Sequence, residues 1–360
     1  MGNCDVTAAT VFGMASATTD LETSDLRYDR DDLMRSHDYA APHVVNGERL
    51  HGGMMADGSY MPPRALVREA AFTAWEVALG ERGGEPLDAD ASLLDGLRMP
   101  TADQQGVLLR NGIGAPFWNG LTITGKIEAR GRALATMQFP ELQPAIVEDI
   151  SEMAIGHLNE GLLVAHGLDE GGSPEEGIGG HDTMWFVVRD LVFGRDAYDD
   201  ADPPESIGRS DSGGRLVEEV DAATEGLISF LANLLIIEFR AENAFADTQA
   251  ILRKTDLFTD RRADAEVGAE IVERIRTDEA IHVRSLCLYL GELRSVTFKT
   301  LDGGTMAGAE LIDRFWDGLV RWATVDQPAI SFDRDRAVLE EHIAGHTDSA
   351  RVLAEFNAAS

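Results

Sequence analysis

The stretch IVERIRTDEAIHVRSLCLY, residues 271–289, decides the fold. Residues three and four positions apart lie on one face of an α-helix, because the helix has about 3.6 residues per turn. One such face carries, in order, Ile271, Ile275, Glu279, His282 and Leu286. The pattern predicts a long buried helix whose apolar stripe is interrupted by a carboxylate and an imidazole.

Helical periodicity covers most of the chain, and the best strand candidate, 295–300, is short. Thr101 and Gln104 form a capping box at one helix start. The expected helices are 66–79, 101–112, 116–137, 144–167, 182–193, 222–253, 265–293, 306–323, 334–344 and 348–357. A glycine-rich loop, 167–180, and an acidic loop, 199–214, separate them. We expect an all-α fold in three parts: an irregular arm (1–62), a helical metal-binding bundle (63–330) and a C-terminal helical extension (331–360).

Composition excludes several classes of protein. There are 63 acidic and 31 basic residues, a net charge of −32, so the surface would repel nucleic acid. The longest apolar run, 228–237, is too short to cross a bilayer, and we expect no membrane partner. Two cysteines cannot form a disulfide framework, and the N-terminus lacks a secretory pattern. The expected location is therefore the cytoplasm.

Three further predicted helices also carry acids on their apolar stripes. Glu238 follows Leu231 and Leu235 in the helix 222–253, and Glu242 comes one turn later. In the earlier hairpin, Glu128 lies on the stripe of 116–137. The stripe of 144–167 carries His157 and Glu160. Burying an ionised carboxylate without a partner costs several kcal/mol, so four such acids need a common counter-charge.

Basic residues do not supply that charge, since only Arg132 lies within a turn of the acids on these stripes. Two divalent cations would neutralise four glutamates, namely Glu128, Glu160, Glu238 and Glu279. His157 and His282 would add one neutral nitrogen ligand for each metal. Oxygen-rich coordination of this kind suits iron or manganese better than zinc or copper.

The heights of these residues along the two hairpins are consistent with a shared site. The turn near residue 259 places Glu238 opposite residue 280, and the turn near residue 140 places Glu128 opposite residue 153. Glu160 lies further along its helix. Glu242 is either an extra ligand or the partner of Arg240 or Arg253.

Glu238 followed by Glu279-Ala280-Ile281-His282 resembles the second half-site of ferritin-like di-iron carboxylate proteins, which use two hairpins that each give one Glu and one Glu-x-x-His. The resemblance covers residues 116–293. It implies a ferritin-like four-helix bundle core with extra N- and C-terminal helices, and two iron ions (or iron and manganese). The first hairpin departs from the pattern, because Ala154 stands where a Glu is expected and His157 precedes Glu160. An asymmetric or single-metal site stays open.

The function implied by the resemblance is an oxygen-dependent oxidoreductase. Its partners would be dioxygen, an organic small-molecule substrate that enters under the loop 167–180, and an external electron-transfer protein, since no segment resembles a ferredoxin or flavin module. Whether the chain forms a homodimer is open. The extra arm, loops and helices make iron storage a poorer fit than a substrate pocket.

Two other classes of function remain. An HD-type metal hydrolase would use His157, His166, His181 and Asp182, but it leaves the striped glutamates unexplained. A non-enzymatic helical interaction protein would carry the Glu-x-x-His tetrad on a solvated face. For His157 and Glu160 the plainer interpretation is a buried hydrogen-bonded pair.

Overall fold

A computed structural model describes residues 26–209 and 214–359, and the described chain is mostly helical, as predicted. The helices are α1 (Arg30–Leu33), α2 (Ala65–Glu81), α3 (Ala102–Arg110), α4 (Ala115–Gly131), α5 (Leu163–Gly171), α6 (His181–Val192), α7 (Ala222–Arg253), α8 (Arg262–Ser295), α9 (Gly308–Arg321), α10 (Gln327–Ala344) and α11 (Ser349–Ala358). The strands are β1 (Ala41–Val45), β2 (Glu48–Met54), β3 (Tyr60–Met61), β4 (Thr297–Lys299) and β5 (Thr305–Ala307). The predicted capping box of Thr101 and Gln104 is present at the start of α3.

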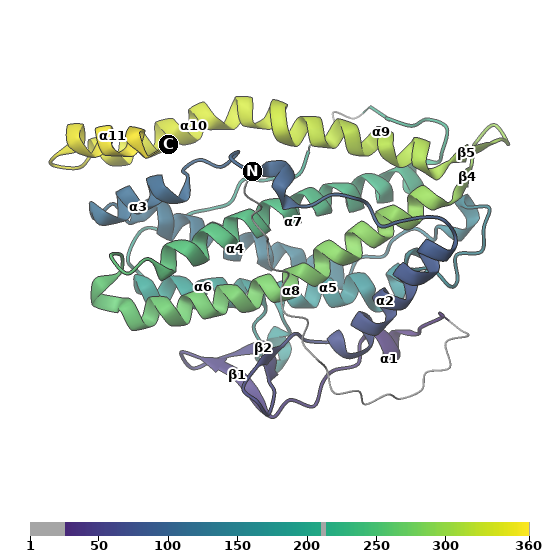
Figure 1. Cartoon of the computed structure of the whole chain (residues 1–360), viewed down its shortest axis with the longest axis horizontal. Helices are drawn as coiled ribbons and strands as arrows, with labels where there is room; N and C mark the ends of the chain where they lie inside the picture. The colour runs from purple at the N-terminus through teal and green to yellow at the C-terminus, as the bar shows by residue number, and fades with distance from the viewer. Residues whose placement is uncertain (1–25, 210–213, 360) are drawn as a thin grey trace, which may run out of the picture.

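The long hairpin of α7 and α8 forms the centre of the molecule (Figure 1). The Asp221 side chain caps α7 by accepting hydrogen bonds from the amides of Ala223 and Thr224. The helix then continues without interruption for 32 residues. On the far side of the hairpin, α6 packs against both α4 and α8, and α5 packs against α4. Helices α9 to α11 cross the top of this core (Figure 1).

The predicted helix 144–167 is wrong. Its first half is a chain of short turns, and Ile146 is extended and bridges to Phe298. Gly161 has φ +123°, a conformation that favours glycine and breaks the helical phase. A regular helix, α5, begins only at Leu163.

The predicted glycine-rich loop starts later than expected, because α5 continues to Gly171. Its glycines are needed for close helix packing: a Cβ on Gly167 would lie 2.4 Å from the Ala135 nitrogen, and one on Gly171 would lie 2.3 Å from the Arg132 Cβ. The loop itself is 172–180. Its two ends nearly touch, since a Cβ on Gly172 would lie 2.4 Å from the Gly180 nitrogen. Helices α5 and α6 therefore meet end to end in the middle of the bundle (Figure 1).

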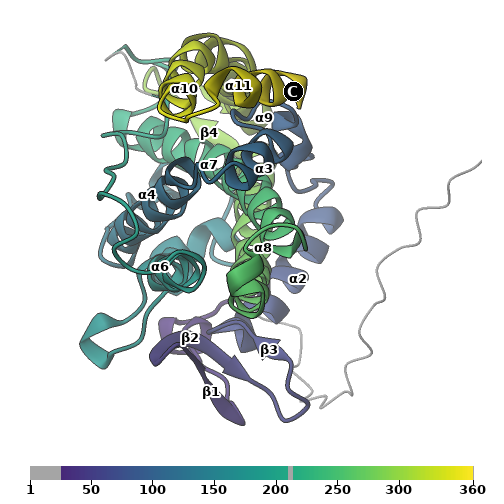
Figure 2. The same cartoon turned by 90° about the vertical axis from the view of Figure 1, so that its left-hand side faces the viewer.

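The N-terminal arm is less irregular than predicted. Strands β1, β2 and β3 form an antiparallel sheet in that order below the bundle (Figure 2), while residues 1–25 lie outside the described part. The loop 172–180 joins this sheet, because the His51 amide donates to Gly179 O at 2.7 Å and the Gly179 amide donates to Arg49 O. The sheet thus covers the junction of α5 and α6.

The remaining predictions on the fold have clear outcomes. The strand expected at 295–300 is confirmed as β4, which pairs antiparallel with β5. No helix or strand occurs in 194–209, and residues 210–213 of the acidic loop are outside the described residues. By length and composition one described helix, α7, could cross a membrane; 56% of its most apolar window is buried in the fold, as in the core helix of many proteins.

Candidate metal centre

Four glutamates and three histidines meet in the interior of the bundle. The structure brings together Glu128 from α4, Glu238 from α7, and Glu279 and His282 from α8, all predicted from their stripes and all buried. Three residues not predicted as metal ligands on those stripes join them: His166 and Glu170 from α5, and His181, the first residue of α6.

These residues fall into two groups, in each of which the ligand atoms lie within 4.8 Å of one another. One group consists of His166, Glu170, Glu238 and His282. The other consists of Glu128, Glu170, His181 and Glu279. Glu170 belongs to both groups, so it lies between two adjacent candidate metal positions.

Glu170 and Glu279 are surrounded by imidazole nitrogens. Glu170 Oε1 lies 3.4 Å from His166 Nε2, 3.3 Å from His282 Nδ1 and 3.9 Å from His181 Nδ1. Glu279 places Oε1 3.0 Å from His181 Nδ1 and Oε2 2.9 Å from His282 Nδ1. Each of these two carboxylates therefore contacts imidazoles from more than one helix.

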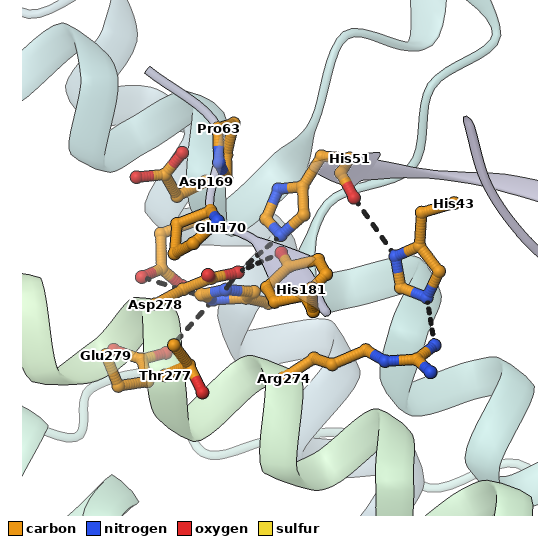
Figure 3. A network of polar contacts seen from close by, with 12 residues as sticks. His43, His51, Pro63, Asp169, Glu170, His181, Arg274, Thr277, Asp278 and Glu279 are labelled. Carbon is orange, nitrogen blue, oxygen red and sulfur yellow. Dashed lines mark hydrogen bonds and ion pairs between the residues drawn. The ribbon is translucent and has the colours of Figure 1, made fainter. Parts of the chain in front are cut away.

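A second pair of carboxylates orients two of the histidines from outside. His282 Nε2 lies 3.3 Å from Asp169 Oδ2, and Asp169 is held in turn by Arg64 and Arg68. His181 Nε2 lies 3.2 Å from Asp278 Oδ2 (Figure 3). A carboxylate accepting from Nε2 leaves the lone pair on Nδ1, which is the nitrogen that faces the cluster in both histidines.

The N-terminal sheet supports Asp278. Its Oδ2 accepts hydrogen bonds from the Tyr60 hydroxyl at 2.8 Å and from His51 Nε2 at 2.9 Å. His51 O in turn accepts from His43 Nδ1, whose other ring nitrogen accepts from Arg274 (Figure 3). His51, His181 and Asp278 could also hold an ion by their spacing, but the three hydrogen bonds on one oxygen identify this group as the support of His181.

The contacts inside the cluster need a positive charge, which either a proton or a metal ion can supply: His282 Nδ1 lies at hydrogen-bond distance, 2.9 Å, from Glu279 Oε2. Among the described residues, the buried His181 Nδ1 has no hydrogen-bond partner, although Glu279 Oε1 is only 3.0 Å away. A lone pair facing a carboxylate oxygen at that distance is repulsive unless a positive charge lies between them. The residues present could therefore hold a metal ion.

The electrostatics lead to the same conclusion. At 4.8 Å two unit negative charges repel by about 3.5 kcal/mol for an effective dielectric constant near 20, and several such pairs coexist here. Burial raises the pKa of Glu170 and of Glu238 well above their ordinary values, and the neighbouring glutamates add to the effect. For Glu279, burial is outweighed by His282 and His181, which hold its pKa well below the usual range.

Arginine and lysine do not balance this charge. Within 26–209 and 214–359, none of the four glutamates forms an ion pair with a lysine or arginine; the close partners of Glu170, Glu238 and Glu279 are histidines. Arg68, which is buried, and Arg64, which is half-buried, both pair with Asp169. The cluster therefore needs protons or metal ions as counter-charge.

Three predicted ligands are not in the cluster. His157 is buried elsewhere, where Nδ1 donates to Met153 O at 2.8 Å and Nε2 accepts the Tyr28 amide at 3.0 Å. Glu160 is exposed, because the irregular turn around Gly161 directs it away from the core, so the expected His157–Glu160 pair is also absent. Glu242 is half-buried on α7 and belongs to neither group.

The residues of the hydrolase alternative are divided. His166 and His181 belong to the cluster, but His157 does not. Asp182 is half-buried, and its carboxylate accepts the amide and hydroxyl of Thr183. The His-Asp pair required for that alternative is therefore not formed.

Comparisons of the chain with protein-family models, with curated proteins and with solved structures found no match.

Proposed function

We propose that the chain holds two divalent metal ions, iron or iron and manganese, and acts as an oxygen-dependent oxidoreductase on an organic small molecule. One observation carries the proposal: four buried glutamates and three imidazole nitrogens converge from five helices without a lysine or arginine among them. Two divalent ions would supply the charge of +4 that these carboxylates require.

The two groups divide the ligands between two metal positions. Glu128 and His181 would hold one ion, and Glu238, His166 and His282 the other, with Glu170 common to both. Glu279 contacts histidines of both groups and is a second candidate to be shared. Mixed oxygen and nitrogen ligands of this kind suit iron and manganese.

A ferritin-like arrangement is part of the proposal. Its four helical segments would be α4, the interrupted pair α5–α6, α7 and α8 (Figures 1 and 2). Helices α4, α5, α7 and α8 each contribute one glutamate to the cluster, and α6 contributes His181. In the first half-site, His166 and Glu170, four residues apart on one helix face, would take the place of the predicted His157 and Glu160.

A bound pair of such ions would supply redox chemistry with dioxygen. The residues of the chain would hold the ions, exclude water and fix the imidazoles: Asp169 orients His282, and Asp278 orients His181. An external electron-transfer protein, a cytoplasmic location and the lack of nucleic-acid or membrane partners remain predictions, and homodimer formation remains open.

The test is to load the protein anaerobically with Fe²⁺, dialyse it, measure metal content, and record the ultraviolet–visible spectrum after exposure to air. About two irons per chain and a new absorption band are expected. Glu238→Gln should lower the metal content, whereas the matched variant Glu242→Gln, one turn further along α7, should not. Stoichiometric zinc without iron uptake would overturn the proposal.

The metal contents of Glu238→Gln and Asp182→Asn distinguish the proposed function from the hydrolase and the interaction protein. A hydrolase of the HD type predicts that Glu238→Gln keeps its metal and that Asp182→Asn loses it. An interaction protein predicts that neither change alters the metal content.

A further inference from the structure

A cavity of about 450 Å³ lies beside the metal centre, between α4, α7 and α10. Glu128 of the centre lines it, so whatever fills the cavity contacts a candidate metal ligand. The rest of the wall is largely apolar and includes Ile127, Ile207, Ile237, Phe245, Trp322 and Ile330. A cavity of this size, with apolar walls and few polar groups, is typical of small-molecule sites.

Arg240 is the polar group that distinguishes this cavity. Its Nη1 donates to Ile207 O at 3.0 Å, and its guanidinium lies 4.8 Å from the centre of the Trp322 ring. Its Nη2 is buried and has no hydrogen-bond partner within the described chain. The pairing with Glu242 that the sequence left open is not seen among the described ion pairs. By contrast, Arg253 on the same helix pairs with Glu273 at 2.7 Å.

A half-buried guanidinium with a buried, unpartnered Nη2 and no ion pair among the described residues needs an explanation in this chain. A buried charged donor without a partner is unfavourable, and 63 acidic residues offer many ways to satisfy one. A second arginine, Arg334, lines the same cavity and has Asp335 as its partner. The cavity thus offers positive charge next to an apolar wall, in a protein that is otherwise strongly acidic.

We propose that this cavity is the substrate pocket and that its substrate is a carboxylic acid with an apolar body, whose carboxylate pairs with Arg240. The carboxylate would accept a charge-assisted hydrogen bond from Nη2 of Arg240, which lacks a partner among the described residues. The apolar body would lie against the isoleucines, Phe245 and Trp322, next to Glu128. That the bound acid is a substrate rests on the proposed function; that the cavity binds an organic acid does not.

The cavity is not where substrate entry was predicted. The loop 172–180 pairs with β2 and packs over the opposite side of the site, through Gly179 and Arg49. Residues Pro204, Ser206, Ile207 and Gly208 of the second, acidic loop line the cavity instead. The described part of the acidic loop therefore forms one wall of the pocket.

The test uses three small molecules that each have eight carbon atoms and differ in their polar group: octanoate, octan-1-ol and octylamine. Their affinities are measured by titration calorimetry, first with the metal-free protein. Octanoate should bind about tenfold or more tightly than octan-1-ol, which corresponds to one hydrogen bond to a charged group. Octylamine should bind more weakly than octan-1-ol, because Arg240 repels it.

Variants locate the binding. Arg240→Gln should lose the preference for octanoate, Arg240→Lys should keep most of it, and the matched variant Arg253→Gln should leave it unchanged. Ala241→Trp, which fills the cavity, should abolish binding of octanoate while circular dichroism shows a folded helical protein. Equal octanoate affinity in the wild type and Arg240→Gln would overturn the proposal.

Loading with Mn²⁺ distinguishes this proposal from the proposed function. If the ion occupies the centre, its paramagnetism should broaden the proton resonances of bound octanoate in the wild type. Octanoate binding that depends on Arg240, in a protein that takes up no metal, would support the pocket and overturn the oxidoreductase. Metal uptake without octanoate binding would overturn the substrate class alone.

Discussion

Replacing Glu170 with glutamine should affect the metal-free and the metal-loaded protein in opposite ways. The ligand atom of Glu170 lies within 4.8 Å of those of Glu128, Glu279 and Glu238. Each pair of unit charges at that distance repels by about 3.5 kcal/mol at an effective dielectric constant near 20. In the metal-free protein the glutamates either repel one another or remain protonated. The neutral variant Glu170→Gln should therefore be as stable as the wild type, or more stable by up to about 4 kcal/mol.

With metal present the order should reverse. Each site that is occupied at 100 times its dissociation constant adds about 2.7 kcal/mol to the free energy of unfolding, so two sites add about 5 kcal/mol. Glu170 belongs to both groups, and its loss should reduce this gain to that of one weakened site or less.

The assay is denaturation by urea, followed by circular dichroism, in a chelator and in anaerobic Mn²⁺. Glu242→Gln, which changes a half-buried glutamate outside both groups, is the control and should gain as much from the metal as the wild type. An equal gain in Glu170→Gln, or a metal-free variant several kcal/mol less stable than the wild type, would refute the reasoning.

Three further predictions concern buried residues outside the cluster. His157→Gln should lower the free energy of unfolding by about 1–3 kcal/mol, because its partners are left unsatisfied, while metal analysis should find the same metal content as in the wild type. Asp278→Asn should weaken metal binding by about 10–100-fold in a chelator competition, because it releases His181; an unchanged affinity would show that the hydrogen bond has no positioning role. Burial raises the pKa of Glu292 to about 7, from an ordinary value of 4.5, so the native state retains a proton that the unfolded state loses. Its contribution to stability is therefore complete below about pH 4.5 and decreases as the pH rises to 7, by about 3 kcal/mol. Urea denaturation of the metal-free protein at pH 5 and pH 8 should show this loss in the wild type relative to Glu292→Gln, and parallel curves would contradict it.

The second half of the centre could be predicted because its helices are uninterrupted. Helix α7 runs for 32 residues and α8 for 34, so the period of 3.6 keeps Glu238, Glu279 and His282 on the buried stripes throughout. No backbone irregularity intervenes between the apolar positions and the acids. Local periodicity was therefore sufficient to identify these three residues.

In the first hairpin, Glu128 was predicted from its stripe, but its partners His166 and Glu170 were not. The stripe through His157 and Glu160 assumes one helix, but the positive φ of Gly161 ends that phase before α5 begins. The glycines from 167 onward suggested a loop, whereas Gly167 and Gly171 are helical residues that allow α5 to approach the turn Arg132–Ala135. Only the spacing of His166 and Glu170, four residues apart, could have indicated that these residues join the cluster.

The contacts between the N-terminal sheet and Asp278 were even harder to predict from the sequence. His51 and Tyr60 reach Asp278 from a segment more than 200 residues away in sequence, through contacts that depend on how the sheet docks. The alternation along β2 is weak, since Leu50 and His51 are both buried. Such tertiary contacts are not encoded in local periodicity.

The claim that metal ions join the carboxylates of separate helices is tested most directly by anomalous X-ray diffraction at the iron edge, on crystals of the iron-loaded protein. We predict two anomalous peaks in the interior, one beside Glu128 and His181 and one beside Glu238 and His166, with Glu170 adjacent to both. Iron-loaded crystals without an anomalous peak among these residues would contradict the account.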